Sequence, residues 1–372
     1  MRSVHVYQSA VKDSFVMENS FVRIVIDSSG HITSFYDLNE RRELVPRGEL
    51  GNAFELYDDV PLYWDAWDEE VYLREKFKPL DAVRLEITEA GPLLASISVR
   101  VPISDQSALT QTISLSAISP RLDFDCEIDW HENRKSLKTS FTWDISSDFA
   151  TYETQYGVVQ RPTHRNTSWD LAKFEVCAHK FADLSEYGYG IALLNDCKYG
   201  HSTLGNTMSL SLIRAPKAPD EHCDMGKHKF RYAVYPHKGT FSESNVVQEA
   251  YQFNVPLLQI PVSASDLRMM AAEDLSPFFS VTGAPNVVLD AVKVAEDDRD
   301  SFIVRLYEAY GGHGRALITS RLNARHVQKV NILEEPIKEQ NGEDLSVKWL
   351  QHSRTVEVSV KPFEIVTLLF SR

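Results

Sequence analysis

Cysteines are few in this chain of 372 residues, and long apolar runs are absent. Both features limit the classes of protein to which the chain can belong. The four cysteines, Cys126, Cys177, Cys197 and Cys223, lie far apart, without the Cys-x-x-Cys spacing of zinc or redox sites. We therefore expect buried free thiols and a reducing compartment. No apolar run approaches the length of a membrane span, and residues 1–15 lack the plan of a signal peptide, so we expect no membrane partner.

Basic residues are also in deficit. The chain has 53 acidic and 39 basic residues, which gives a formal net charge of −14 at pH 7. Nucleic acid and anionic membranes would repel such a surface, so we expect neither as a partner. A hydrophobic content of 43% is ordinary for a soluble globular protein, and the length suits roughly two to three domains. The sequence shows neither a nucleotide-binding glycine pattern nor a zincin helix.

What the sequence does contain is a series of β patterns separated by turn-rich breaks. The sharpest lies over residues 122–130, where every second residue is apolar. Because no helical pattern of any length intervenes, the sequence predicts an all-β chain with a large antiparallel β-sandwich, or super-sandwich. Only residues 244–253 have the apolar spacing of a short helix. About seven short β patterns after residue 286 predict a smaller, immunoglobulin-like β-sandwich.

Changes in composition give the expected domain bounds. Residues 1–15 are polar and mixed, and we expect a poorly ordered start. The large β-sandwich domain is expected over residues 16–260. A segment rich in Ser, Ala and Pro, residues 261–285, reads as a linker, and the small sandwich follows over residues 286–372.

The stretch from Gly51 to Asp68 concentrates aromatic rings and carboxylates. Its candidate binding residues are Asp58, Asp59, Tyr63, Trp64, Asp65, Trp67 and Asp68. A carboxylate accepts hydrogen bonds from hydroxyls and an indole offers a flat apolar face, so this set suits a sugar. Pro61 favours a loop over a central strand. The alternative is a structural corner in which the indoles fill a core and the aspartates cap turns.

Residues 156–170 form a second dense polar segment, whose proline and asparagine indicate a loop. Its candidate binding residues are Gln160, Arg161, Asn166, Trp169 and Asp170. Loops with this mixture usually bind a ligand, but a polar hairpin tip with Trp169 packed beneath it explains the pattern equally well. Further on, His222, Cys223 and His228 lie close together, but their spacing matches no common zinc pattern, so we assign no metal site.

The order of these motifs carries a resemblance. They are Gly51-Asn52-x-Phe54, the Asp58–Asp68 run, Gln160-Arg161-Pro162-Thr163, Asn166-Thr167-Ser168-Trp169-Asp170, residues 193–200 and residues 212–220. Together they resemble the C-terminal half of the cytosolic and vacuolar α-mannosidases of glycoside hydrolase family 38. The resemblance covers nearly the whole chain and is weaker over residues 285–372.

This resemblance implies a retaining glycoside hydrolase that removes terminal α-mannose from free oligosaccharides or N-glycan fragments, in the cytoplasm or a vacuole. In the family, zinc (or cobalt) and the catalytic aspartates belong to an N-terminal α/β-barrel followed by a helical domain. We do not find that portion, so we assign no catalytic or metal residue here and expect the chain alone to be inactive. The implied partners are a mannose-containing oligosaccharide and that barrel and helical domain of the same enzyme, with a homo-oligomer left open.

The resemblance also implies a role for Gln160 and Arg161, because family members send an arginine from an equivalent loop towards the active site. Here the order Gln-Arg-Pro departs from the Gln-Pro-Arg of Golgi and lysosomal relatives. The loop from Asp58 to Asp68 is expected either to contact sugar or to dock a domain. Two other interpretations remain: a free-standing carbohydrate-binding β-sandwich without hydrolase activity, and a scaffold whose polar loops only hold neighbours in place.

Overall fold

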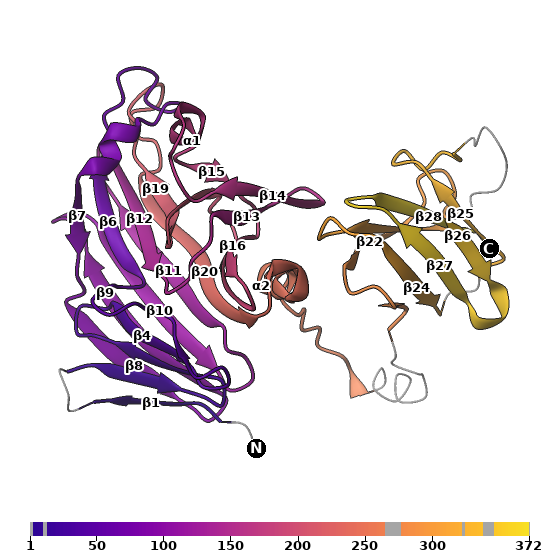
Figure 1. The fold of residues 1–372 in the computed structure, drawn as a ribbon, viewed down its shortest axis with the longest axis horizontal. Helices are drawn as coiled ribbons and strands as arrows, with labels where there is room; N and C mark the ends of the chain where they lie inside the picture. Colours follow the sequence, from indigo (N-terminus) through magenta and orange to yellow (C-terminus); the bar gives the residue numbers. More distant parts are fainter. Residues whose placement is uncertain (1–2, 10–12, 265–276, 322–323, 338–345, 372) are drawn as a thin grey trace. The chain divides into compact units, whose positions relative to one another are not determined.

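The computed structural model describes residues 3–9, 13–264, 277–321, 324–337 and 346–371 (Figure 1). Contacts between residues divide the chain into two compact units, each described here by itself. The first unit comprises Met1–Glu153 and Val159–Val255, and the second comprises Thr154–Val158 and Pro256–Arg372. Within the described residues, no helix is both long enough and apolar enough to pass through a membrane.

The first unit contains three β-sheets. The five-stranded sheet has the order β1 (His5–Gln8), β2 (Phe15–Glu18), β3 (Val22–Ile26), β4 (Ile32–Asp37) and β5 (Arg42–Glu43). The nine-stranded sheet has the order β14 (Gly157–Pro162), β13 (Phe149–Thr154), β16 (Phe181–Glu186), β17 (Tyr189–Asn195), β20 (Gly226–Lys238), β11 (Leu122–Trp130), β10 (Ala108–Ser116), β9 (Leu94–Pro102) and β8 (Arg84–Ala90). The six-stranded sheet has the order β15 (Val176–Cys177), β18 (Gly200–Leu204), β19 (Thr207–Arg214), β12 (Lys135–Thr142), β6 (Ala53–Asp58) and β7 (Phe77–Leu80).

Short helices connect or cover these strands. They are η1 (Val71–Glu75), α1 (Ser168–Ala172), η2 (Phe241–Glu243) and α2 (Val246–Asn254). The helix predicted over residues 244–253 is therefore present as α2, which buries Val246, Val247, Ala250 and Phe253. The five-residue helix α1 was not predicted.

Period-two alternation explains the large core. In β11, every second residue from Leu122 to Trp130 is buried, while the acidic residues between them face outwards. Antiparallel pairing of β11 with β10 and β20 repeats that pattern across the sheet. Aromatic rings fill the interior, and Phe124 stacks on Tyr232 with 4.8 Å between ring centroids. The predicted all-β fold is confirmed.

The second unit is a smaller β-sandwich of two four-stranded sheets. One has the order β21 (Phe279–Thr282), β24 (Gly314–Ser320), β27 (Thr355–Val360) and β26 (Val347–Leu350). The other has the order β22 (Val287–Val294), β23 (Phe302–Glu308), β28 (Ile365–Ser371) and β25 (His326–Val330), and the helix η3 (Gln351–Ser353) follows β26. All seven predicted strands are present, and β21 lies inside the segment predicted as a linker. The bounds 16–260 and 261–285 stay predictions, and residues 265–276 lie outside the described part.

The chain differs from the predictions near its start. The segment expected to be poorly ordered, residues 1–15, contains β1, which pairs with β2 while Val4 and Val6 are buried, and its residues 1–2 and 10–12 lie outside the described part. A strand of four residues is too short for alternation to be recognised among polar neighbours.

Two further predictions were wrong. The segment predicted as a loop, residues 156–170, contains the strand β14, so Gln160 and Arg161 lie on a strand. Pro162 ends β14, which is the edge of its sheet, where a missing N–H costs no ladder bond. The thiols are free, but of the four only that of Cys126 is buried.

Candidate functional site

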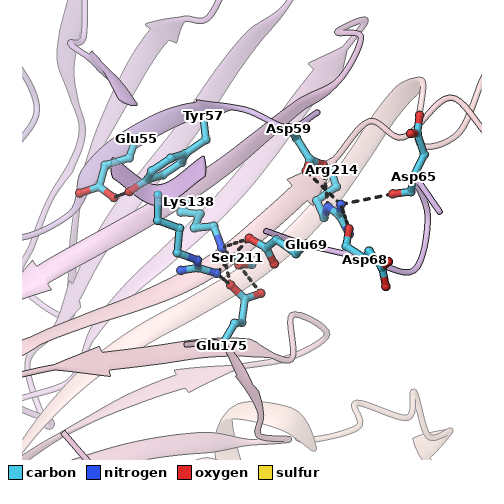
Figure 2. A network of polar contacts seen from close by, with 11 residues as sticks. Glu55, Tyr57, Asp59, Asp65, Asp68, Glu69, Lys138, Glu175, Ser211 and Arg214 are labelled. Atoms are coloured by element: carbon cyan, nitrogen blue, oxygen red, sulfur yellow. Dashed lines mark hydrogen bonds and ion pairs between the residues drawn. The ribbon is translucent and has the colours of Figure 1, made fainter. Parts of the chain in front are cut away.

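Arg214, the last residue of β19, holds the loop of residues 58–70 at the end of β6, here called the aromatic loop. Its guanidinium donates to both carboxylate oxygens of buried Asp59, at 2.7 Å to Oδ2 and 3.0 Å to Oδ1. The same group donates to the backbone carbonyls of Asp68 at 2.8 Å and Asp65 at 3.3 Å (Figure 2). Burial alone would lower the pKa of Arg214, but the hydrogen bonds and charge of Asp59 outweigh it and raise that pKa. One side chain therefore fixes the loop at three points.

The other three aspartates of the loop have different surroundings. The Asp65 carboxylate lies 3.3 Å from Arg134 Nη2 and accepts the backbone N–H of Lys217 at 3.2 Å. Asp58, at the end of β6, pairs with Lys135 of the neighbouring strand β12. Asp68 is exposed, and its carboxylate has no hydrogen-bond or ion-pair partner among the described residues. Three of the four predicted aspartates are thus engaged by cations.

The aromatic side chains of the loop face solvent. Tyr63, Trp64 and Trp67 are 73%, 70% and 69% exposed. The two indoles meet edge to face, with 6.3 Å between ring centroids and an interplanar angle of 86°. Trp64 has φ of +57°, and its carbonyl accepts the N–H groups of Trp67 at 2.8 Å and Asp68 at 2.9 Å, which closes a tight turn. A fixed backbone thus presents exposed rings, and the interpretation in which the indoles fill a core is wrong.

A second polar cluster lies behind this loop, centred on Lys138 of β12. The Lys138 side chain is only 2% exposed, and its Nζ contacts Glu175, Glu69 Oε1 at 3.0 Å and Ser211 Oγ at 2.9 Å (Figure 2). Arg74 of η1 pairs with the same two carboxylates. Burial would raise the pKa of Glu175, but Lys138 and Arg74 outweigh it and hold that pKa well below its usual range.

This cluster connects the two segments that the sequence singled out. Glu69 comes from the aromatic loop, whereas Glu175 follows the segment of Gln160, Arg161, Asn166, Trp169 and Asp170. The Arg74 guanidinium also lies 5.0 Å from the ring centroid of Phe174. The sequence gave no clear signal for this cluster, because Lys138 lies in β12 among Thr and Ser residues, and Arg214, Lys138 and Glu175 were all missed as site residues.

The second segment leaves β14 and enters α1. Thr163 is buried, and its hydroxyl donates to the carbonyl of Ser147 at 2.7 Å. Thr167 caps α1 by accepting the N–H of Asp170 at 3.1 Å, and its hydroxyl donates to Asp170 Oδ2 at 2.8 Å. His164 Nδ1 lies 3.8 Å from that carboxylate oxygen.

The remaining candidates of this segment differ in exposure. Gln160 and Asn166 are exposed, and Trp169 is 78% exposed, so the predicted packing beneath a hairpin is absent. Arg161 is half-buried, and its Nε has no hydrogen-bond partner among the described residues. The segment therefore offers an exposed indole beside a guanidinium with unused donors.

The family resemblance implies zinc in the N-terminal barrel, and the described residues of this chain offer no set of ligands that fits it. Among them, no three His, Cys, Asp or Glu side chains are placed together to hold a metal ion. His228 Nε2 contacts the carbonyl of Asp224 at 2.7 Å, and His222 Nε2 lies 3.3 Å from Glu221.

Comparison with known families gives two matches. Residues 17–222 match the family described as "Glycosyl hydrolases family 38 C-terminal domain". Residues 286–368 match the "Glycosyl hydrolases family 38 C-terminal beta sandwich domain". Apart from Thr154–Val158, the first match falls on the first unit, and the second match falls on the second unit.

Curated relatives match over nearly the whole chain. Human "Alpha-mannosidase 2C1" is 42% identical over 360 residues, which cover 96% of this chain and 33% of the relative. "Alpha-mannosidase" of Saccharomyces cerevisiae is 38% identical over 384 residues, covering 95% of this chain and 34% of the relative. The chain thus spans about a third of the length of the curated relatives it matches.

A solved structure shares the fold. The crystal structure of an alpha-mannosidase from Enterococcus faecalis superposes with a TM-score of 0.75 at 18% sequence identity. The superposition covers 99% of this chain and 43% of that one. At this identity, the likeness concerns the fold alone.

Proposed function

The chain belongs to glycoside hydrolase family 38, and from that membership we propose that it forms the C-terminal β-rich part of an α-mannosidase. The proposed reaction is the retaining hydrolysis of terminal α-mannose from free oligosaccharides or N-glycan fragments. It rests on family matches over both units and on relatives, named as α-mannosidases, that are about three times as long. In this proposal, the catalytic carboxylates and the zinc belong to other parts of the enzyme.

The contribution of this chain is one wall of the substrate pocket. The observation that carries this proposal is the loop whose backbone is fixed by Arg214 while Tyr63, Trp64 and Trp67 stay exposed. Folding alone gains nothing from leaving three large rings in water, whereas a pyranose ring packs well on an indole face. Asp68 is the one aspartate of the loop whose carboxylate is free, among the described residues, to accept sugar hydroxyls.

The other aspartates have a different proposed role. Asp59 and Asp65 hold the loop through Arg214 and Arg134, and Asp58 pairs with Lys135, so we propose that they position the aromatic residues without binding sugar. From the second segment, Gln160, Arg161, Asn166, Trp169 and Asp170 remain candidates for substrate contact. Arg161 is the strongest of these, because the family resemblance and its unused buried donor agree.

A second use of the aromatic loop has support from the same exposure. Large exposed rings rimmed by charges also mark protein interfaces, so the loop could instead dock another domain of the enzyme. A free-standing carbohydrate-binding module is not favoured, because the longer relatives match 95–96% of this chain. A cytoplasmic or vacuolar location and a homo-oligomer stay predictions.

Two variants of the enzyme, expressed as its gene encodes it, test the proposal. We expect Trp67→Ala to raise KM for an aryl α-mannoside about tenfold with little change in thermal stability, since one stacked sugar face contributes about 1–1.5 kcal/mol. Tyr187→Ala is the matched control, because Tyr187 is fully exposed in the turn between β16 and β17. Equal effects of the two substitutions would remove the loop from the substrate pocket.

The chain of 372 residues supplies a second arm of this test. We expect it to show no turnover of the aryl α-mannoside with added zinc or cobalt. Tryptophan fluorescence should show weak mannose binding by this chain, and that binding should be lost in Trp67→Ala. Robust turnover by these residues alone would overturn the proposal, because the nucleophile and the acid would then have to lie among them.

A further inference from the structure

A small pocket lies between β14, α1 and β18, within the first unit. Its polar lining includes Arg161, His164, Arg165, Asp170 and Lys173, with Tyr152, Phe174 and Thr203 completing the wall. Counting Asp170, the lining carries two net positive charges if His164 is neutral. This is a local excess of cations on a chain whose formal net charge is −14.

The cations of this pocket have no ionic partner among the residues that the structure describes. Neither Arg161 nor Arg165 forms an ion pair or a side-chain hydrogen bond within the described part of the chain, and the ammonium group of Lys173 forms none there either. Arg161 Nε is buried without an acceptor, which is rare in folded proteins and calls for a ligand or an ion. Most other arginines near this site, such as Arg74 and Arg214, have carboxylate partners.

The one acid of the pocket does not neutralise these cations. Asp170 Oδ2 accepts the Thr167 hydroxyl at 2.8 Å and lies 3.8 Å from His164 Nδ1, but Asp170 forms no ion pair with Arg161, Arg165 or Lys173. Burial, and then the nearby charge of Arg74, lower the pKa of Arg165.

The size of the pocket limits its occupant. The cavity measures about 20 Å³, which is room for roughly one water molecule or one oxygen-sized group, so a pyranose ring does not enter it. The exposed side chain of Lys173 forms part of the rim, so the space is reached from solvent. The occupant is therefore a charged group that places an oxygen inside while the rest of the ligand stays at the mouth.

We propose that this pocket binds the phosphoryl group of a small ligand, held by Arg161, Arg165 and Lys173. A phosphate monoester carries close to two negative charges and three acceptor oxygens, which match two guanidinium groups and one ammonium. A carboxylate would offer one charge and two oxygens, leaving one cation unused. The ligand is either a sugar phosphate or free inorganic phosphate, and only the first source depends on the function proposed above.

Calorimetric titration of the 372-residue chain at constant ionic strength tests this proposal. The probes are inorganic phosphate, mannose 6-phosphate and mannose. We expect saturable binding of phosphate, weakened about tenfold or more in Arg165→Gln and in Lys173→Gln. Lys227→Gln is the matched control, because it removes one exposed charge on β20 and should leave the affinity unchanged. Equal thermal unfolding of the variants shows that their fold is kept.

The outcomes separate the two sources and the two proposals. Mannose 6-phosphate binding at least tenfold tighter than inorganic phosphate identifies a sugar phosphate, whereas equal or weaker binding identifies free phosphate. Absence of saturable binding of both, or unchanged affinity in Arg165→Gln, would overturn the phosphoryl site. Mannose binding that depends on Trp67 would survive that result, so the function proposed above is judged independently.

Discussion

At the scale of single residues, Arg214 shows how a polar side chain can decide the conformation of a whole loop. Asp59 is 3% exposed, and its ionic partner is Arg214. The two form a buried ion pair in which the guanidinium donates to both carboxylate oxygens. Such a pair contributes little more to stability than apolar side chains of similar volume would. Removing one partner, however, leaves an uncompensated charge in the interior. Removal of Arg214 should therefore destabilise the protein more than removal of one member of an exposed ion pair.

Arg214→Gln should lower the free energy of unfolding by about 3 kcal/mol, because Asp59 is left buried without its cation. Urea denaturation of the two proteins measures the difference. Arg134→Gln is the control, since Arg134 is half-exposed and, among the described residues, its side chain pairs only with Asp65, so its loss should stay within about 0.5 kcal/mol. A comparable loss from both substitutions would mean that the Asp59 pair has no special weight.

His201 is a second residue whose effect follows from burial. Its ring is 1% exposed, Nε2 lies 3.2 Å from Asn195 Nδ2, and Nδ1 has no partner within the described residues. Burial lowers the pKa of His201 to about 4, although the charge of Glu175 opposes the shift. The unfolded chain takes up a proton near pH 6.5 while the native ring stays neutral, so protonation favours unfolding as the pH falls.

We therefore expect the free energy of unfolding to lose about 3 kcal/mol through His201 between pH 6.5 and pH 4. Other histidines and carboxylates titrate as well, so the informative quantity is the difference between the chain and His201→Gln in urea denaturation at several pH values. The variant should show a smaller loss over this range. Parallel curves for the two proteins would contradict a buried neutral His201.

At the scale of elements, η1 is a helix without a core of its own. None of its residues is buried, and its N-cap residue Glu70 makes no side-chain cap. What holds η1 to the six-stranded sheet is Arg74, which meets Glu69 and Glu175 above Lys138 of β12 and Ser211 of β19. The position of the aromatic loop thus depends on charges that are paired beneath it, on the sheet.

Lys138→Met should cost about 3 kcal/mol of unfolding free energy, because two carboxylates then share only Arg74. The double substitution Lys138→Met with Glu175→Gln should recover a large part of that loss, since the remaining pair of Arg74 and Glu69 is balanced. Denaturation of the two single variants and the double variant gives the coupling energy. Additive losses would show that the cluster is not one network.

Some of these elements could be predicted from the sequence, and others could not. Long alternating strands such as β11 were recognised because their burial follows local chemistry. The edge strand β14 was predicted as a loop because Pro162 was interpreted as a loop signal. Proline is excluded only from central strands, and the sequence does not show which strands lie at the edge of a sheet. The aromatic loop was identified as a candidate site, but Asp59 was assigned to substrate because its partner lies 155 positions further on.

At the scale of the whole molecule, the described residues form two large hydrophobic cores that are built from different parts of the chain. The larger one joins residues from Val4 to Val234, and a smaller one joins residues from Ala284 to Phe370. Within the smaller unit, Glu308 is fully buried and its carboxylate accepts the N–H groups of Tyr310, Gly311 and Phe363 as well as Asn286 Nδ2 at 2.8 Å. These bonds outweigh the opposing effect of burial and lower the pKa of Glu308.

Glu308→Ala leaves several buried donors unpaired, so we expect it to destabilise the smaller unit by about 3 kcal/mol or more. Because the two cores are built from different residues, the loss should be local. Hydrogen exchange measured peptide by peptide should show faster opening of β23, β24 and β28 and unchanged protection of β10, β11 and β20. If protection fell equally in both sets of strands, the chain would unfold as one cooperative body, and a substitution in the terminal sandwich would then reach the aromatic loop by destabilising the whole chain.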